Sequence, residues 1–170
     1  MTKRIVSFLS ILFILGSGWL SAQHQSQIQS AYIYNFTKYM QWPQSKQSGK
    51  FIIAVVGKSS LTTHLKILSA TKKVGIQDIT VREYNSIDEI NQCHIILLSP
   101  SSSTQLTGAI NKAEDINALI ITDKSGLAKQ GAGLNFVLIG GKPRFEINPD
   151  AINKCKIKVN PKLTSMGIKA

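Results

Sequence analysis

Short apolar blocks alternate with polar turn residues along most of this chain. Four blocks have the length and composition of strands, at 51–56, 79–84, 94–98 and 118–122. The block 51–56 is a continuous apolar run rich in Val and Ile, as expected of a strand that is covered on both faces. Segments with helical spacing or a helical turn separate them, at 60–70, 87–92 and 103–113. Alternating strands and helices predict an α/β fold: a mostly parallel sheet flanked by helices in a Rossmann-like three-layer arrangement.

The pattern changes after Gly126. Two apolar runs, 134–139 and 144–147, are joined by Gly140-Gly141-Lys142-Pro143, which predicts a C-terminal β-hairpin with Pro143 at a sheet edge. A short helix is expected from Asn148 to Asn153, followed by a last strand at 157–159 and a tail. No repeat or low-complexity linker interrupts residues 23–170, so we expect a single domain there.

The first 22 residues have the pattern of a secretory signal peptide. Lys3 and Arg4 precede an apolar stretch at 5–15, the segment Gly16-Ser17-Gly18 is expected to break the helix, and Ser21-Ala22 offers small residues for cleavage. The alternative is an uncleaved anchor. The expected mature protein is therefore exported to the periplasm after cleavage near Ala22.

An aromatic segment follows the predicted cleavage position. Ile28, Tyr32, Phe36 and Met40 fall on one face of a helix that must end before Pro43. This face has two interpretations, a covering for the sheet or a docking surface for a partner. Tyr34, Lys38 and Trp42, together with the lysine-rich C-terminal tail, are the predicted partner-binding residues.

The chain is strongly basic, with a formal net charge of +11. Its lysines are scattered except in the tail, and Arg82 and Arg144 are the two arginines after the predicted signal. Specific nucleic-acid readers rely on arginine, so we expect a solvated basic surface and no nucleic-acid partner.

Polar residues follow three of the predicted parallel strands, and ligands bind at that edge of such sheets. The segment Gly57-Lys58-Ser59-Ser60 lacks the earlier glycine of a phosphate-binding loop, so nucleoside triphosphate binding is not expected. The same backbone with Ser101 and Asp123 predicts at most a weak site for an anion or an amino acid. Ordinary polar loops are the favoured explanation of these residues.

Histidines and carboxylates show no catalytic or metal-ligand spacing. We therefore expect no cofactor, no metal and no enzymatic activity. Cys93 and Cys155 each precede a predicted strand and have two interpretations, a disulfide in an oxidising compartment or two buried free thiols.

Three segments together resemble the YfiR family of periplasmic proteins. They are residues 31–39 with Trp42-Pro43, the strand 51–56 ending at Gly57, and residues 134–148 with Ile157 and Pro161-Lys162-Leu163. The resemblance covers nearly all of residues 23–170. The cysteines and the Thr164-Ser165-Met166-Gly167 ending depart from the family pattern, which leaves the partner open.

This resemblance implies a small α/β domain without a catalytic centre. It implies that the protein binds and restrains a membrane-bound signalling protein such as a diguanylate cyclase, in cyclic-di-GMP signalling. A periplasmic domain that binds a small ligand is the alternative, and a homodimer stays open.

Overall fold

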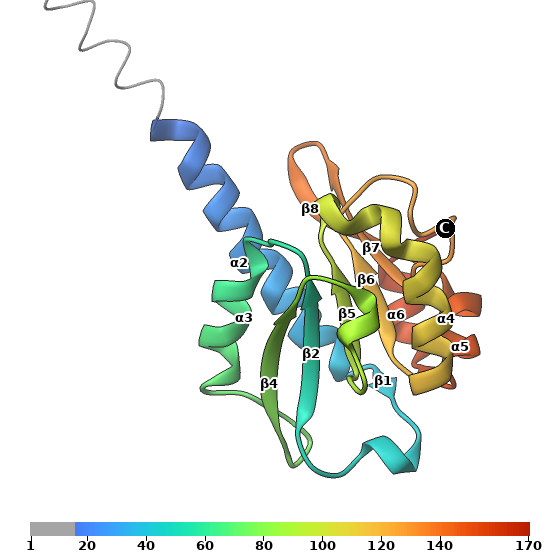
Figure 1. The fold of residues 1–170 in the computed structure, drawn as a ribbon. Helices are drawn as coiled ribbons and strands as arrows, with labels where there is room; N and C mark the ends of the chain where they lie inside the picture. The colour runs from blue at the N-terminus through green and yellow to red at the C-terminus, as the bar shows by residue number, and fades with distance from the viewer. Residues whose placement is uncertain (1–15) are drawn as a thin grey trace, which may run out of the picture.

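A computed structural model describes residues 16–170, with side chains described from Gln23 onward. Its centre is an eight-stranded sheet in the order β10-β8-β7-β6-β5-β2-β4-β3 (Figure 1). In chain order these strands are β2 (Phe51–Val56), β3 (Lys73–Val74), β4 (Gln77–Tyr84), β5 (Ile95–Leu98), β6 (Leu119–Thr122), β7 (Leu134–Ile139), β8 (Lys142–Ile147) and β10 (Ile168–Lys169).

The central strands β4, β2, β5, β6 and β7 run parallel to one another. Strands β2, β5 and β6 are buried at every position, as their continuous apolar runs predict. The predicted hairpin is confirmed: β7 and β8 are antiparallel and turn at Gly140-Gly141, both at positive φ. The predicted α/β fold class is therefore confirmed.

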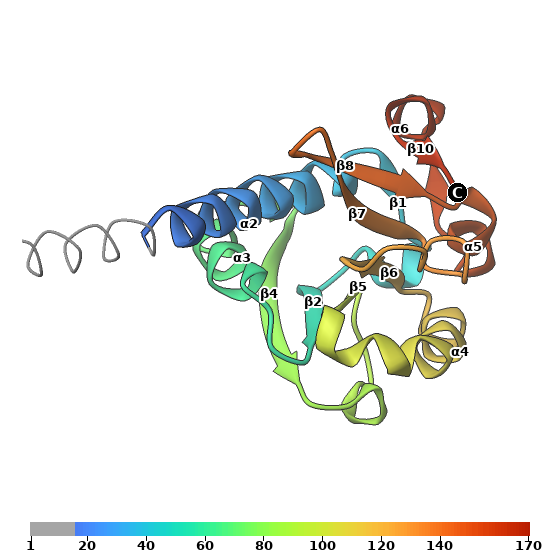
Figure 2. The same cartoon turned by 90° about the horizontal axis from the view of Figure 1, so that it is seen from above.

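Helices cover both faces of the sheet. They are α2 (Gly16–Thr37), α3 (Leu61–Ser69), α4 (Leu106–Ile116), α5 (Pro149–Lys154) and α6 (Pro161–Met166), with short 3₁₀ turns η1 (Gln44–Lys46), η2 (Ile87–Glu89) and η3 (Pro100–Gln105). Helices α2 and α3 lie side by side on one face, while α4 and α5 lie on the other (Figure 2).

A separate two-stranded ribbon joins two segments that are distant in the sequence. Strand β1 (Met40–Gln41) pairs antiparallel with β9 (Lys158–Val159). The pairing begins where α2 ends, because Pro43 cannot continue a helix and the residue before it favours an extended backbone. The ribbon ties the start of the domain to its C-terminal part.

The apolar stretch 5–15, whose helix Gly16-Ser17-Gly18 is expected to break, lies outside the described residues, and these three residues belong to α2. The predicted apolar face of α2 is buried only in part. Phe36 and Met40 are buried, whereas Ile28 and Tyr32 are half-buried, and the helix also buries the polar side chains of Ser26, Gln29 and Ser30.

The lysine, arginine and apolar run that define the predicted signal peptide lie in residues 1–15, outside the described residues. The predicted cleavage position, Ala22, falls within α2. Within residues 16–170, none of the helices combines the length and the apolar character that crossing a bilayer requires.

Candidate functional site

The carboxyl ends of β2 and β5 meet in a cluster of serine hydroxyls around Gly57. Gly57 has a φ of 76°, and a Cβ atom there would lie 2.2 Å from the Oγ of Ser102 and 2.5 Å from the Oγ of Ser99. The Oγ of Ser99 lies 2.9 Å from that of Ser101 and donates to that of Ser102 at 3.3 Å. Glycine is therefore required here for two reasons, its backbone conformation and the close approach of the hydroxyls.

Helix α2 lies over this edge of the sheet. The Oγ atoms of Ser26 and Ser60 are 2.7 Å apart, and the Nε2 of Gln29 donates to Asp123 Oδ1 at 3.2 Å. Burial raises the pKa of the Asp123 carboxyl, while the hydrogen bond from Gln29 lowers it. Ser26 and Gln29 are themselves buried. The polar loop ends thus face a polar helix surface.

The structure brings only some of the six predicted ligand residues together. Ser101 lies beside Gly57, whereas Ser60 and Asp123 each contact α2. Lys58 is exposed, and the Oγ of Ser59 accepts a hydrogen bond from the backbone N–H of Leu61 at the start of α3. Sequence reasoning missed Ser26 and Gln29, because polar residues within a helix are usually placed on its exposed face.

The aromatic part of α2 packs against the hairpin. The ring centroids of Phe36 and Phe145 are 4.8 Å apart in an edge-to-face arrangement, and Phe136 stacks on Phe36 at 6.1 Å. Tyr32 lies 5.9 Å from Phe36 and 6.0 Å from Phe145. This segment had two interpretations, a covering for the sheet or a docking surface. The packing of these rings supports the first interpretation for the Phe36 face.

The three predicted partner-binding residues have different surroundings. Lys38 is exposed, and its Nζ lies 4.6 Å from the ring centroid of Tyr34, which is half-buried. Trp42 is only 5% exposed, and its Nε1 donates to the backbone carbonyl of His94 at 3.1 Å. The expectation that Trp42 contacts a partner therefore needs correction: its ring is buried and its polar atom is paired within the domain.

A buried polar network surrounds Trp42 at the amino ends of the strands. His94 Nδ1 accepts from the backbone N–H of Ile52 at 3.0 Å, so its Nε2 carries the proton and donates to the carbonyl of Lys46 at 2.8 Å. Burial lowers the pKa of His94. Lys46 Nζ donates to the carbonyl of Cys93 at 3.0 Å, and desolvation lowers the pKa of Lys46. These groups are held in place by backbone atoms.

The two cysteines are free, buried thiols. Burial raises the pKa of Cys93 to about 12. Burial and the nearby charge of Glu114 raise the pKa of Cys155 to about 11. A thiol with so high a pKa is protonated at neutral pH and is a weak nucleophile. The structure thus contains the free-thiol alternative that the sequence left open, and not a disulfide.

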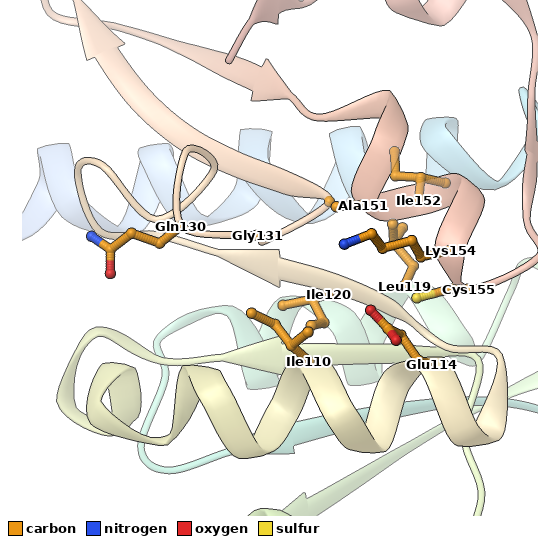
Figure 3. Close-up of a pocket in the computed structure, with 11 residues that line it drawn as sticks. Ile110, Glu114, Leu119, Ile120, Gln130, Gly131, Ala151, Ile152, Lys154 and Cys155 are labelled. Carbon is orange, nitrogen blue, oxygen red and sulfur yellow. The ribbon is translucent and has the colours of Figure 1, made fainter.

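Cys155 lines a small pocket between α4 and α5 (Figure 3). The pocket has a volume of about 140 Å³. Its walls include the apolar side chains of Ile110, Ile120 and Ile152, while Glu114 and Lys154 reach toward it from opposite helices (Figure 3). Within the described part of the chain, no group of three or more His, Cys, Asp or Glu side chains is placed to hold a metal ion.

The hairpin motif has a structural explanation. Asn135 is fully buried, and its Oδ1 accepts from Thr122 Oγ1 at 2.7 Å while its Nδ2 donates to Glu146 at 2.8 Å. Asn148 caps α5 by accepting from the N–H of Ala151. The polar positions of the 134–148 segment therefore satisfy buried groups on β6, β7 and β8.

The comparison with protein families decides the identity of this domain. The model of the YfiR/HmsC-like family matches residues 26–167. The chain belongs to the YfiR/HmsC-like family. The match begins at Ser26 of α2 and ends at Gly167, just before β10, so it covers the second half of α2, the other seven strands of the sheet and the β1–β9 ribbon.

The resemblance to the YfiR family is thus confirmed. The YfiR-like family is periplasmic and is known for regulation rather than catalysis. A search of curated proteins finds no match to this chain.

Proposed function

We propose that this YfiR/HmsC-like protein is exported to the periplasm, where it binds a membrane-bound signalling protein and restrains it without chemical conversion of a substrate. The family match over residues 26–167 carries this proposal. The partner class that it favours is a diguanylate cyclase or a sensor that controls one. Residues 1–22 supply the export signal, and cleavage near Ala22 leaves 23–170 as one domain.

The chemistry of the domain supports a binding role. Its two thiols are buried, with pKa values raised to about 12 and about 11. His94 is buried, with both ring nitrogens hydrogen-bonded to backbone groups. Both thiols are protonated at neutral pH and both ring nitrogens of His94 are already hydrogen-bonded, so none of these three groups is prepared to act as a nucleophile or a general base.

The partner surface that we propose is formed by Tyr34, near the end of α2, and Lys38, just after that helix. The ammonium of Lys38 lies over the Tyr34 ring and also donates to Asn35 Oδ1 at 3.0 Å. A tyrosine with an ordered cation beside it is a common type of interface anchor. Trp42 is not included, because it is buried.

A double substitution, Tyr34→Ser with Lys38→Ser, tests this surface. Wild type and variant are expressed with their signal peptides, crosslinked in cells and purified with any membrane protein that is bound. We expect the wild type to capture a cyclase or sensor and the variant to capture at least about tenfold less. Cyclic-di-GMP levels should rise in cells that carry the variant.

Gln27→Ser with Lys129→Ser is the matched control, since both side chains are exposed and neither is in the proposed surface. Equal capture by the Tyr34/Lys38 variant and the wild type would contradict the surface, and failure of the wild type to enrich any membrane signalling protein would contradict the function.

Binding of a small ligand at the carboxyl ends of the strands has less support. Ser60 and Asp123 lie against α2, and their polar atoms are hydrogen-bonded to Ser26 and Gln29. A ligand there would have to displace part of the helix. A homodimer remains a prediction.

A further inference from the structure

Lys156 has an unusual backbone conformation for a lysine. Helix α5 ends at Lys154, and two residues later Lys156 has a φ of 56°. Its N–H donates to the carbonyl of Asn153 at 2.8 Å, and the N–H of Ile157 donates to the carbonyl of Ile152 at 3.4 Å. These are the two hydrogen bonds of a Schellman motif, with Lys156 at the position that is usually glycine.

Among the described residues, those with positive φ are seven glycines, Asn117 and Lys156. Asparagine tolerates this conformation because its short amide can bond to nearby backbone groups. Lysine has no such group, so its Cβ carries the full steric cost. Glycine would stabilise this turn, and the presence of lysine therefore calls for a role of the amine.

Lys156 lines a groove beside the β1–β9 ribbon. The groove has a volume of about 320 Å³, within the range of small-molecule sites. Lys156 precedes strand β9 and Lys158 is its first residue; both line the groove, while Ile157 between them is buried. The remaining lining residues are Gln41, Trp42, Pro43, Gln44 and Gln47.

The lining has a consistent chemistry. Its lining residues include two lysines and three glutamines and no acidic residue. Lys158 is paired with Gln41 across the ribbon, and Gln47 donates to the carbonyl of Trp42 at 2.8 Å, which orients its amide. Ammonium groups bind phosphate or carboxylate, and carboxamides both donate to and accept from hydroxyls.

We propose that this groove binds a small soluble anion that carries hydroxyl groups, of the class of sugar phosphates and sugar acids. Lys156 and Lys158 bind the acidic group, while Gln41, Gln44 and Gln47 contact the hydroxyls. The left-handed conformation of Lys156 is kept because it places the amine in the groove. Neither Tyr34 nor Lys38 lines this groove, and the proposal does not depend on that partner surface.

The first test is a titration of the purified, exported protein with glucose 6-phosphate, glucuronate and neutral glucose, followed by calorimetry and thermal shift. We expect at least one of the two anions to bind, to raise the Tm and to bind less tightly as salt increases. Comparison of the two anions shows which acidic group is preferred. Binding of glucose as tight as that of both anions, or no binding of either anion, would overturn the proposal.

The second test uses Lys156→Gly, which separates stability from binding. Because glycine adopts a positive φ without steric cost, we expect the Tm of this variant to be about 2–4 °C higher than that of the wild type. Loss of the amine should weaken anion binding at least about tenfold. Lys156→Asn, which also tolerates this conformation, should lose binding to a similar extent.

Lys158→Ser should likewise weaken binding, whereas Lys129→Ser removes an exposed lysine outside the groove and should bind normally. Undiminished binding by the glycine variant, or a fall in its Tm, would overturn the role given to Lys156. These readouts use the isolated protein, so they are independent of the capture experiment on the membrane partner.

Discussion

The two ends of the central sheet are closed in different ways. At the amino end, the Trp42 ring is buried, packs edge-to-face on Phe51 at 5.0 Å and donates to a backbone carbonyl. At the carboxyl end, α2 is joined to the loops by side-chain contacts, such as the hydrogen bond from Gln29 to Asp123. One end is closed by a large apolar side chain and backbone bonds, and the other by short polar side chains.

This difference determines how each end responds to change. Removal of a large buried ring leaves a cavity that the surrounding core cannot fill. Removal of one partner from a partly buried polar pair costs much less, since water can replace the lost group. The amino end should therefore carry the stability of the domain, while the carboxyl end should tolerate substitution and local opening.

Trp42→Ala should have the largest effect on this comparison. Loss of the buried ring and its hydrogen bond should lower the free energy of unfolding by about 3–5 kcal/mol. Trp42→Phe keeps a ring and removes the N–H, so it should cost about 1 kcal/mol. Urea unfolding of both variants measures this difference, and a cost below about 1 kcal/mol for Trp42→Ala would contradict the structural role of the amino end.

Gly57→Ala probes the serine cluster at the carboxyl end. The left-handed backbone should cost about 1–2 kcal/mol, and displacement of the Ser99 and Ser102 hydroxyls should add about 1 kcal/mol. Gly49→Ala is a matched control, because Gly49 has a φ of 74° and no atom within 4 Å of an added Cβ. Equal unfolding free energies for the two variants would show that the hydroxyl cluster adjusts freely.

Gln29→Ala tests the contact between α2 and the sheet edge. Loss of its hydrogen bond to Asp123 should lower the free energy of unfolding by about 1 kcal/mol. Hydrogen exchange at the start of α3 and after β6 should become faster in this variant, because α2 is held less firmly there. Gln27→Ala, at an exposed position of the same helix, should change neither quantity.

The smallest expected effects concern the pH dependence of stability, which should differ between the two ends of the sheet. Burial lowers the pKa of His94 from 6.5, so the unfolded chain binds a proton first and stability falls as the pH drops below about 6.5 through the folded pKa. His94→Gln should remove this loss. Urea unfolding at a series of pH values measures it, and an unchanged slope in the variant would assign the effect to another group.

Asp123 should contribute with the opposite sign. Burial raises its pKa from 3.8, so the unfolded chain ionises first and stability falls as the pH rises from about 3.8 through the folded pKa. Asp123→Asn should remove this decrease. At pH 7 the variant should unfold at a urea concentration at least as high as that needed for the wild type. A less stable variant at that pH would indicate that the charged carboxylate itself is needed at this edge.

Most of the fold was predictable because its strands are marked by composition. The apolar runs at 51–56 and 134–139 coincide with β2 and β7, and the two glycines after Ile139 form the predicted turn. A strand that is covered on both faces must be apolar throughout, and this requirement is visible without tertiary information. The short strands β1, β3 and β10 were missed, because two residues carry no periodicity.

The surroundings of the candidate sites were less predictable. The sequence selected Gly57, Ser101 and Asp123 as residues at one edge of the sheet, but it contains no signal that α2 covers this edge. A polar residue within a helix is usually exposed, yet Ser26 and Gln29 are buried because they meet polar loop ends. Tryptophan is likewise common at protein interfaces, but Trp42 is buried like a core residue.

The amino-acid sequence by itself determined the α/β class, the hairpin and the family, since these depend on local pattern and on motifs within short segments. Only the tertiary structure decided which polar groups are buried, that the two thiols remain apart as free cysteines, and that Lys156 reaches the groove beside the ribbon. Burial and backbone conformation arise from contacts between segments distant in the chain, and no local pattern records those contacts.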